Sequence, residues 1–113
     1  MIINNVELID IDIFDVEVAE KYENALKEVE TVASKVKDMK LSESVRTQCE
    51  SIFKVFNILF GEGADKKIFG DKMNLLTCIK AFEELVVQVN DQKSAIEEIA
   101  SKYSPNRAQR RKK

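Results

Sequence analysis

Residues 61–70 read Gly-Glu-Gly-Ala-Asp-Lys-Lys-Ile-Phe-Gly and contain all three glycines of the 113-residue chain. The most apolar segments of the sequence lie on either side, residues 52–60 before this stretch and residues 75–89 after it. Glycine reaches positive φ without a clash from a Cβ atom, so glycines gathered between two apolar runs mark a place where the chain turns. We therefore predict that residues 61–70 are the joint between two buried helices.

The joint also contains Lys66 and Lys67 after two glycines, which invites comparison with a phosphate-binding loop. The P-loop pattern G-x-x-x-x-G-K-[ST] follows a strand, whereas here a helix is predicted first and no Ser or Thr follows the lysines. We instead predict a helical turn at Ala64–Phe69 that is closed by Gly70 and packs Ile68 and Phe69 on the core.

Apolar residues with alternating gaps of three and four predict three main helices. The first should cover about residues 16–39, with Asp15 as its N-cap, and the second should open near Ser42. The third should begin at a cap formed by Asp71 or Asn74 and run to Tyr103. The predicted core-facing residues are Val18, Tyr22, Ala25, Val29, Val32, Val36 and Met39 in the first helix, Val45, Cys49, Ile52, Phe56 and Leu59 in the second, and Leu75, Ile79, Phe82, Val86 and Val89 in the third.

The second half of the third helix has few apolar residues, so we expect it to project, fray or pack on the first helix. At the other end of the chain, Asn4 and Asn5 form a plausible turn between two short strands. Alternation of Ile9, Ile11 and Ile13 with two aspartates further predicts a half-buried strand.

The chain is nearly neutral, but its charge is uneven. Residues 1–30 carry a net charge of −7, the last ten residues +5, and residues 31–103 balance. These patterns predict an all-α fold, a three-helix bundle with a short N-terminal β element, made of one domain over residues 1–103 and a flexible, disordered basic tail over residues 104–113. No signal peptide or membrane-spanning segment is evident, so we expect a soluble, cytoplasmic protein.

The sequence contains few of the residues and motifs that enzymes use for catalysis. The chain has no histidine, which removes the commonest general base and metal ligand, and no pattern indicates a cofactor or a metal. Cys49 and Cys78 are expected to be reduced thiols that fill the core, at positions that allow them to oppose each other across the second and third helices. We therefore do not expect an enzyme.

The end of the chain offers one alternative function, a nucleic-acid-binding regulator. Its contacts would be Arg107, Arg110, Arg111, Lys112 and Lys113. No aromatic side chain is interleaved to stack on bases, which argues against nucleic acid as the partner.

The run Leu59-Phe60-Gly61-Glu62-Gly63-Ala64-Asp65-Lys66-Lys67-Ile68-Phe69-Gly70-Asp71 resembles small proteins of Gram-positive phages and prophages. So do Asn74-Leu75, Ala81-Phe82-Glu83, the opening Ile2-Ile3-Asn4 and the closing Asn106-Arg107-Ala108-Gln109-Arg110-Arg111. These proteins are phage tail assembly chaperones, or uncharacterised products of the tail gene cassettes beside them.

The resemblance implies a non-enzymatic, mostly helical binding protein that holds the helical tape measure protein while tail tube subunits assemble. A structural phage tail component is the other reading within this class. The resemblance predicts that the partner is the tape measure protein or another tail protein and that the two meet in the cytoplasm of the host cell. Separately, the apolar heptads are compatible with a homo-oligomer. The predicted core or groove residues are Phe53, Phe56, Phe60, Phe69 and Phe82.

Overall fold

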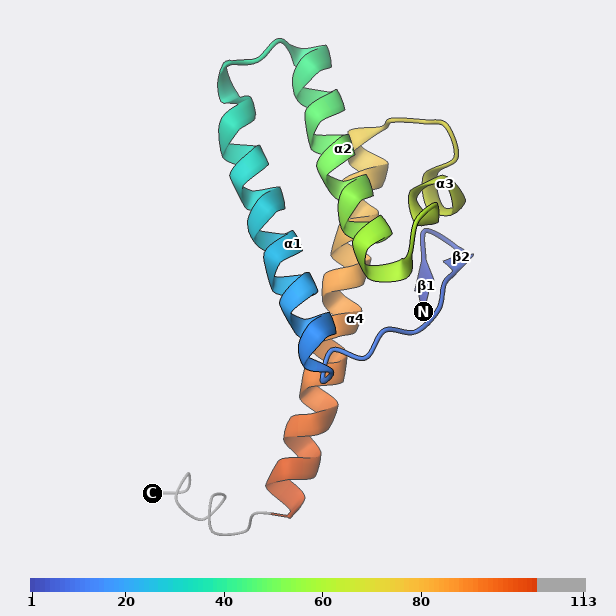
Figure 1. Ribbon diagram of the computed structural model, residues 1–113, viewed down its shortest axis with the longest axis vertical. Coiled ribbons are helices and arrows are strands. Elements are labelled where there is room, and N and C mark those ends of the chain that lie inside the picture. Colours follow the sequence, from blue (N-terminus) through green and yellow to red (C-terminus); the bar gives the residue numbers. More distant parts are fainter. Residues whose placement is uncertain (104–113) are drawn as a thin grey trace.

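The computed structural model describes residues 1–103 and shows a mainly helical protein with a short N-terminal hairpin (Figure 1). The elements in chain order are β1 (Ile2–Ile3), β2 (Val6–Glu7), α1 (Val16–Lys35), the 3-10 helix η1 (Val36–Asp38), α2 (Leu41–Phe60), α3 (Ala64–Phe69) and α4 (Leu75–Lys102). The prediction of three long helices and a short β element is confirmed.

Helix α2 lies at the centre, and α1, α3 and α4 all pack on it. Its predicted seam is confirmed, because Cys49, Ile52, Phe56 and Leu59 are buried. Val55 is buried as well, so α2 contacts neighbours over most of its circumference. The seam predicted for the first helix is also confirmed, since each of its seven residues is buried or half-buried, although Val36 and Met39 lie beyond the end of α1.

The core face of α4 differs from the prediction. Cys78, Ala81, Leu85 and Val89 are buried, whereas Ile79 is exposed. Small side chains at the centre of a contact allow two helices to approach closely, and a pattern based on bulky residues overlooks them. The core face is therefore rotated from the predicted one.

Helix ends follow capping chemistry. Asp15 caps α1 by accepting a hydrogen bond from the Glu17 amide at 3.0 Å, as predicted. Asn74, and not Asp71, caps α4 by accepting from the Thr77 amide at 3.0 Å. The first helix is shorter than predicted, because α-helical geometry ends at Lys35 and η1 follows.

The glycine joint has the predicted form. All three glycines adopt positive φ, α3 covers Ala64–Phe69, and Gly70 closes it. The side chain of Asn57 on α2 accepts a hydrogen bond from the Asp65 amide at 3.0 Å and thereby satisfies one of the free amides at the N-terminus of α3. Ile68 is buried, so the joint carries α3 back onto the core.

The hairpin is formed within the chain. Ile2 pairs with Glu7 and Ile3 with Val6, and the two-residue turn places Asn4 and Asn5 at positive φ. The strand predicted over residues 9–13 is wrong, because this segment has no ladder partner in the described part of the chain and Ile9 is exposed. Ile11 and Ile13 are nevertheless buried, so the alternation reports burial of an extended segment against helices.

The molecule is elongated, with extents of 55 × 31 × 23 Å. Helix α4 is the cause, because its second half continues beyond the other elements (Figure 1). Of the three outcomes expected for this half, projection is the one observed.

We expect Gly61→Ala to lower the free energy of unfolding by about 1–3 kcal/mol. Gly61 has φ 102° and ψ 157°, a region that residues with a Cβ rarely adopt, while the space around it is open. The loss therefore comes from backbone strain and not from a clash. Denaturant unfolding measures it, with Glu62→Ala as the neighbouring control, which should stay within about 0.5 kcal/mol of wild type. Equal stabilities would contradict the strain argument.

Candidate functional site

Four of the five predicted phenylalanines form one cluster at the glycine joint. The Phe69 ring on α3 lies 5.1 Å from the Phe53 ring and 5.8 Å from the Phe56 ring, and Phe56 and Phe60 stack at 6.0 Å. Phe56 is fully buried and the other three are half-buried. Phe82 lies outside these ring contacts and packs on the core from α4. The cluster thus mainly joins α3 to α2.

The cluster has one open side. Phe53 lines a shallow hollow of about 440 Å³ that is bordered by Glu50, Ile58, Glu62 and Asp65 among others. Lys54, also at this hollow, forms an ion pair with Glu28 of α1 at 2.9 Å. Surface ion pairs of this kind contribute little to stability, so the pair mainly orients the two side chains.

A row of polar side chains on α4 fastens the N-terminal segment. Glu84 accepts a hydrogen bond from the Asn4 amide at 3.1 Å, and the Gln88 side chain donates to the Ile2 carbonyl at 2.8 Å. Gln92 donates to the Ile11 carbonyl at 3.0 Å and accepts from the Ile13 amide at 3.3 Å. Residues four apart lie on one face of a helix, so these three form a single stripe.

This stripe was not predicted from the sequence. The sequence feature that could have revealed it is the four-residue spacing of Glu84, Gln88 and Gln92 beside an apolar face. Similar polar residues occur on exposed helix surfaces in general, so this spacing does not single out the stripe. Within the bonded N-terminal segment, the side chains of four residues are buried: Ile3, Leu8, Ile11 and Ile13. The polar stripe therefore sets the register of a segment that apolar burial holds in place.

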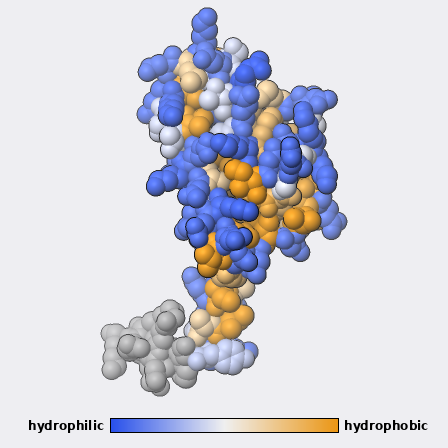
Figure 2. Space-filling view, viewed as in Figure 1, coloured by the Kyte–Doolittle hydropathy of each residue, from blue (hydrophilic) through white to orange (hydrophobic). Residues whose placement is uncertain are grey.

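A second surface gathers apolar side chains where α4 leaves the body. The core-facing positions of α4 recur at Leu85, Val89, Gln92, Ile96, Ile99 and Tyr103. Up to Val89 they are buried, whereas Ile96, Ile99 and Tyr103 are 42–77% exposed. In Figure 2, apolar side chains continue along this projecting part of the helix below the body. Among residues 1–103, no other element covers this continuation of the core face of α4.

The start of α1 adds two apolar residues at the base of this surface. Phe14 is 48% and Val16 70% exposed. The hydrogen bond between the Ile13 amide and Gln92 places the beginning of α1 beside the point where α4 emerges. We call these residues together the stalk patch: Phe14, Val16, Ile96, Ile99 and Tyr103.

Cys49 and Cys78 are fully buried and carry free thiols. Burial raises the pKa of Cys78 to about 12, and a hydrogen bond and charge interaction with Cys49 add to this effect. The two residues therefore face each other between α2 and α4, as the sequence analysis allowed. A thiol with a raised pKa is a poor nucleophile, which fits a core-filling role.

Residues 1–103 contain no group of three or more His, Cys, Asp or Glu side chains that could hold a metal ion. No helix in this part of the chain is long and apolar enough to cross a membrane. Lys66 of the joint lies 3.5 Å from Asp71. The predicted nucleic-acid contacts Arg107, Arg110, Arg111, Lys112 and Lys113 fall outside the described residues.

Residues 1–103 thus form a mainly helical fold in which one helix projects and presents exposed apolar side chains. The chain belongs to the family of unknown function DUF6673, whose model matches residues 4–113. Comparison with curated proteins and with solved structures returned no match.

We expect Gln92→Ala to destabilise the protein by about 1–3 kcal/mol, because the Ile11 carbonyl and the Ile13 amide lose their partner where they are partly buried. Hydrogen exchange at the Ile13 amide should accelerate more than exchange in α2. Asn90→Ala is the matched control, since Asn90 is an exposed amide on the same helix. Similar effects of both substitutions would contradict the anchoring role.

We expect stability to fall as pH rises above about 9, the usual thiol pKa, towards 12. The folded state holds the Cys78 proton more tightly than the unfolded state, so unfolding releases a proton in this window and becomes easier. Denaturant unfolding at several alkaline pH values measures the slope. Cys78→Ala should make the slope shallower, and an unchanged slope would show that this thiol does not contribute.

Proposed function

We propose that the protein is a non-enzymatic binding protein that holds an amphipathic helix of a partner on its stalk patch. In this proposal it acts as a phage tail assembly chaperone, and the partner is the helical tape measure protein during assembly of the tail tube. The observation that carries the proposal is the core face of α4, which continues past the body through Ile96, Ile99 and Tyr103, and these side chains are left exposed by the rest of the described chain, residues 1–103.

An uncovered face of this kind has a physical consequence. Fully burying a large apolar side chain is worth about 1.5–3 kcal/mol, so a second helix lying along the stalk would gain from several such contacts. Apolar residues spaced by three and four on the stalk suit a target whose own apolar residues follow the helical repeat. Phe14 and Val16 would close one end of the contact.

The charges around the base of the patch indicate which helix fits best. Asp12, Asp15 and Glu17 are all exposed beside Phe14 and Val16. A target with lysine or arginine beside its apolar face, at the end that meets the body, would therefore be favoured. Such charges speed association and fix orientation more than they raise affinity.

The resemblance of the glycine joint and the basic tail to tail cassette proteins supports the choice of partner. A tape measure protein is long and helical, and it needs covering before tube subunits surround it. A chaperone in this role leaves before the virion is complete, whereas a structural component stays.

The test is co-expression with the tape measure protein encoded in the same gene cluster. Wild type should keep the partner soluble, and Ile99→Asp should weaken binding by roughly 30-fold, the effect of losing a hot-spot contact of about 2 kcal/mol. Ser94→Asp introduces the same residue on an exposed position of the same helix that is not in the patch, and should bind like wild type.

Circular dichroism should show that both variants fold, because Ile99 and Ser94 are exposed. A partner whose solubility is the same with and without wild type would refute the proposed function. A partner held equally well by the Ile99→Asp variant would refute the stalk patch as its site.

A further inference from the structure

We propose that two copies of the protein pair through the outward face of the first half of α4, as an antiparallel, two-fold symmetric dimer. The face consists of Leu76, Lys80, Glu83 and Val87, and it is separate from the stalk patch. The proposal does not depend on the proposed function.

The face is open and partly apolar. Its four residues are spaced by four, three and four, so they lie along one side of the helix. Leu76 is 63% and Val87 51% exposed, and Ile79 at the margin is 45% exposed. Lys80, Glu83 and Val87 border a hollow of about 520 Å³ together with Glu84 and Gln88.

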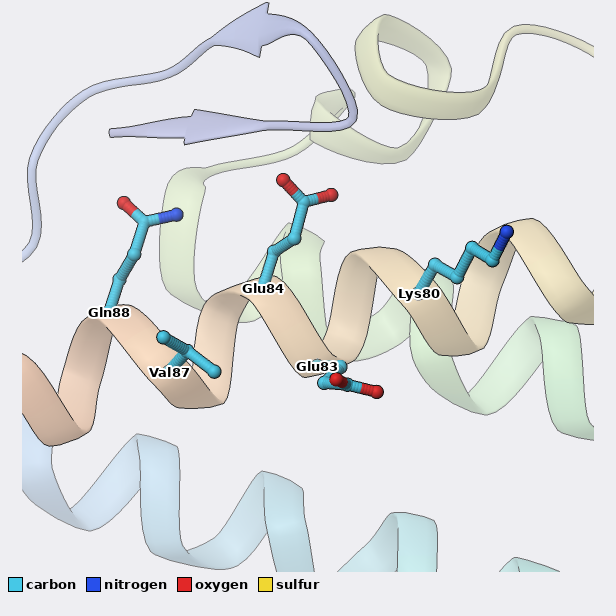
Figure 3. A pocket seen from close by; sticks show the side chains of 5 residues that line it. All are labelled: Lys80, Glu83, Glu84, Val87 and Gln88. Atoms are coloured by element: carbon cyan, nitrogen blue, oxygen red, sulfur yellow. The ribbon is translucent and has the colours of Figure 1, made fainter.

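Figure 3 shows how this side of α4 is divided. Glu84 and Gln88 are directed towards the N-terminal hairpin, while Glu83 and Val87 point away from it, and Lys80 extends on the side of Glu84 towards the N-terminal end of α4. The hairpin therefore occupies one flank of the helix and leaves the neighbouring face accessible.

The order of residues on this face is self-complementary. Leu76 and Val87 are equally far from the midpoint between Ala81 and Phe82, and so are Lys80 and Glu83. With a rise of about 1.5 Å per residue, an antiparallel copy centred on this midpoint places Leu76 against Val87 of the second copy at the same height. It places Lys80 against Glu83 of the second copy in the same way, and symmetry repeats both contacts.

The two charges are available for such contacts. In the part of the chain that the structure describes, the ion pairs join Met1 to Asp10, Lys54 to Glu28 and Lys66 to Asp71, so neither Lys80 nor Glu83 takes part in one. A parallel copy in register would instead set Lys80 against Lys80 and Glu83 against Glu83. The charges therefore favour the antiparallel arrangement.

The order of residues on this face favours a second copy as the occupant. In the antiparallel arrangement each apolar residue meets an apolar one and each charge meets the opposite charge, so a copy of the chain already supplies the complementary surface. One helix face is smaller than the roughly 800 Å² per partner of a standard interface. We therefore expect a dimer that dissociates on dilution.

Charge reversal tests the pairing in solution. Sedimentation velocity of the full chain over a concentration series should show a monomer–dimer equilibrium. Lys80→Glu and Glu83→Lys should each weaken the dimer roughly tenfold or more, because each places four like charges together. The double variant Lys80→Glu/Glu83→Lys restores opposite charges and should dimerise like wild type. Both substituted positions, Lys80 and Glu83, are exposed, so circular dichroism should report a native fold for all three variants.

Cross-linking tests the register. The variant Leu76→Cys/Val87→Cys should form disulfide-linked dimers in oxidised glutathione, whereas neither single variant should. Each single cysteine would be roughly 16 Å from its own copy along the helix axis, too far for a disulfide. The native cysteines are buried and do not compete.

A wild-type chain that stays monomeric throughout the series would overturn the proposal. So would a dimer that is insensitive to Lys80→Glu, or a double variant that remains monomeric. Dimers linked equally well by a single cysteine would overturn the antiparallel register.

Discussion

The contact between α2 and α4 has small side chains at its centre, and the positions of the other elements depend on it. Cys49 on α2 meets Cys78 on α4, and Ala81 follows one turn along; all three are fully or almost fully buried. Interiors are close-packed, so small residues at these points bring the two backbones together and leave no room to rotate α4. The rotation of α4 in turn decides which of its side chains face the hairpin, the solvent and the core.

Different faces of α4 then make different contacts. Leu85 and Val89 complete the core, while the stripe of Glu84, Gln88 and Gln92 bonds the backbone of residues 2–13. The extended N-terminal segment makes few hydrogen bonds with itself, so the polar stripe satisfies backbone groups that burial would otherwise leave unpaired. The short hairpin is thus stabilised by α4 and not by its own two-residue strands, which would be marginal alone.

The sequence predicts those parts of the fold that local chemistry determines. The glycine joint was predictable because only glycine adopts the required φ easily, and the caps at Asp15 and the seams of α1 and α2 follow from spacing. The orientation of α4 about its own axis was not predictable, because the side chains of Cys78 and Ala81 are too small to mark a core face in a pattern of bulky apolar residues. The absence of a strand at residues 9–13 is also a tertiary effect, since alternation shows burial but not the presence of a neighbouring strand.

The predicted phenylalanines illustrate the same limit at the level of the site. Aromatic residues near a turn indicate either a core or a groove, and only the packing of α3 on α2 distinguishes them. The exposed apolar residues at the end of α4 could not be predicted for a different reason. Their exposure depends on where along α4 the packed body of the protein ends. Gln92 is the last residue of α4 that forms hydrogen bonds with the N-terminal segment. Before it, Leu85 and Val89 are buried, whereas the aliphatic residues at the equivalent heptad positions beyond it are exposed.

The two surfaces of α4 have a joint geometric consequence. In an antiparallel dimer centred between Ala81 and Phe82, Ile99 lies about 26 Å from the two-fold axis along the helix, so the two stalk patches are roughly 50 Å apart and project in opposite directions. One dimer therefore presents two separate docking sites and cannot close both on one short helix. It suits a long helical partner, on which simultaneous binding at two sites strengthens attachment without any new contact. Dilution would dissociate the dimer and with it this gain, so binding of a long helix would depend on protein concentration more steeply than binding of a short peptide.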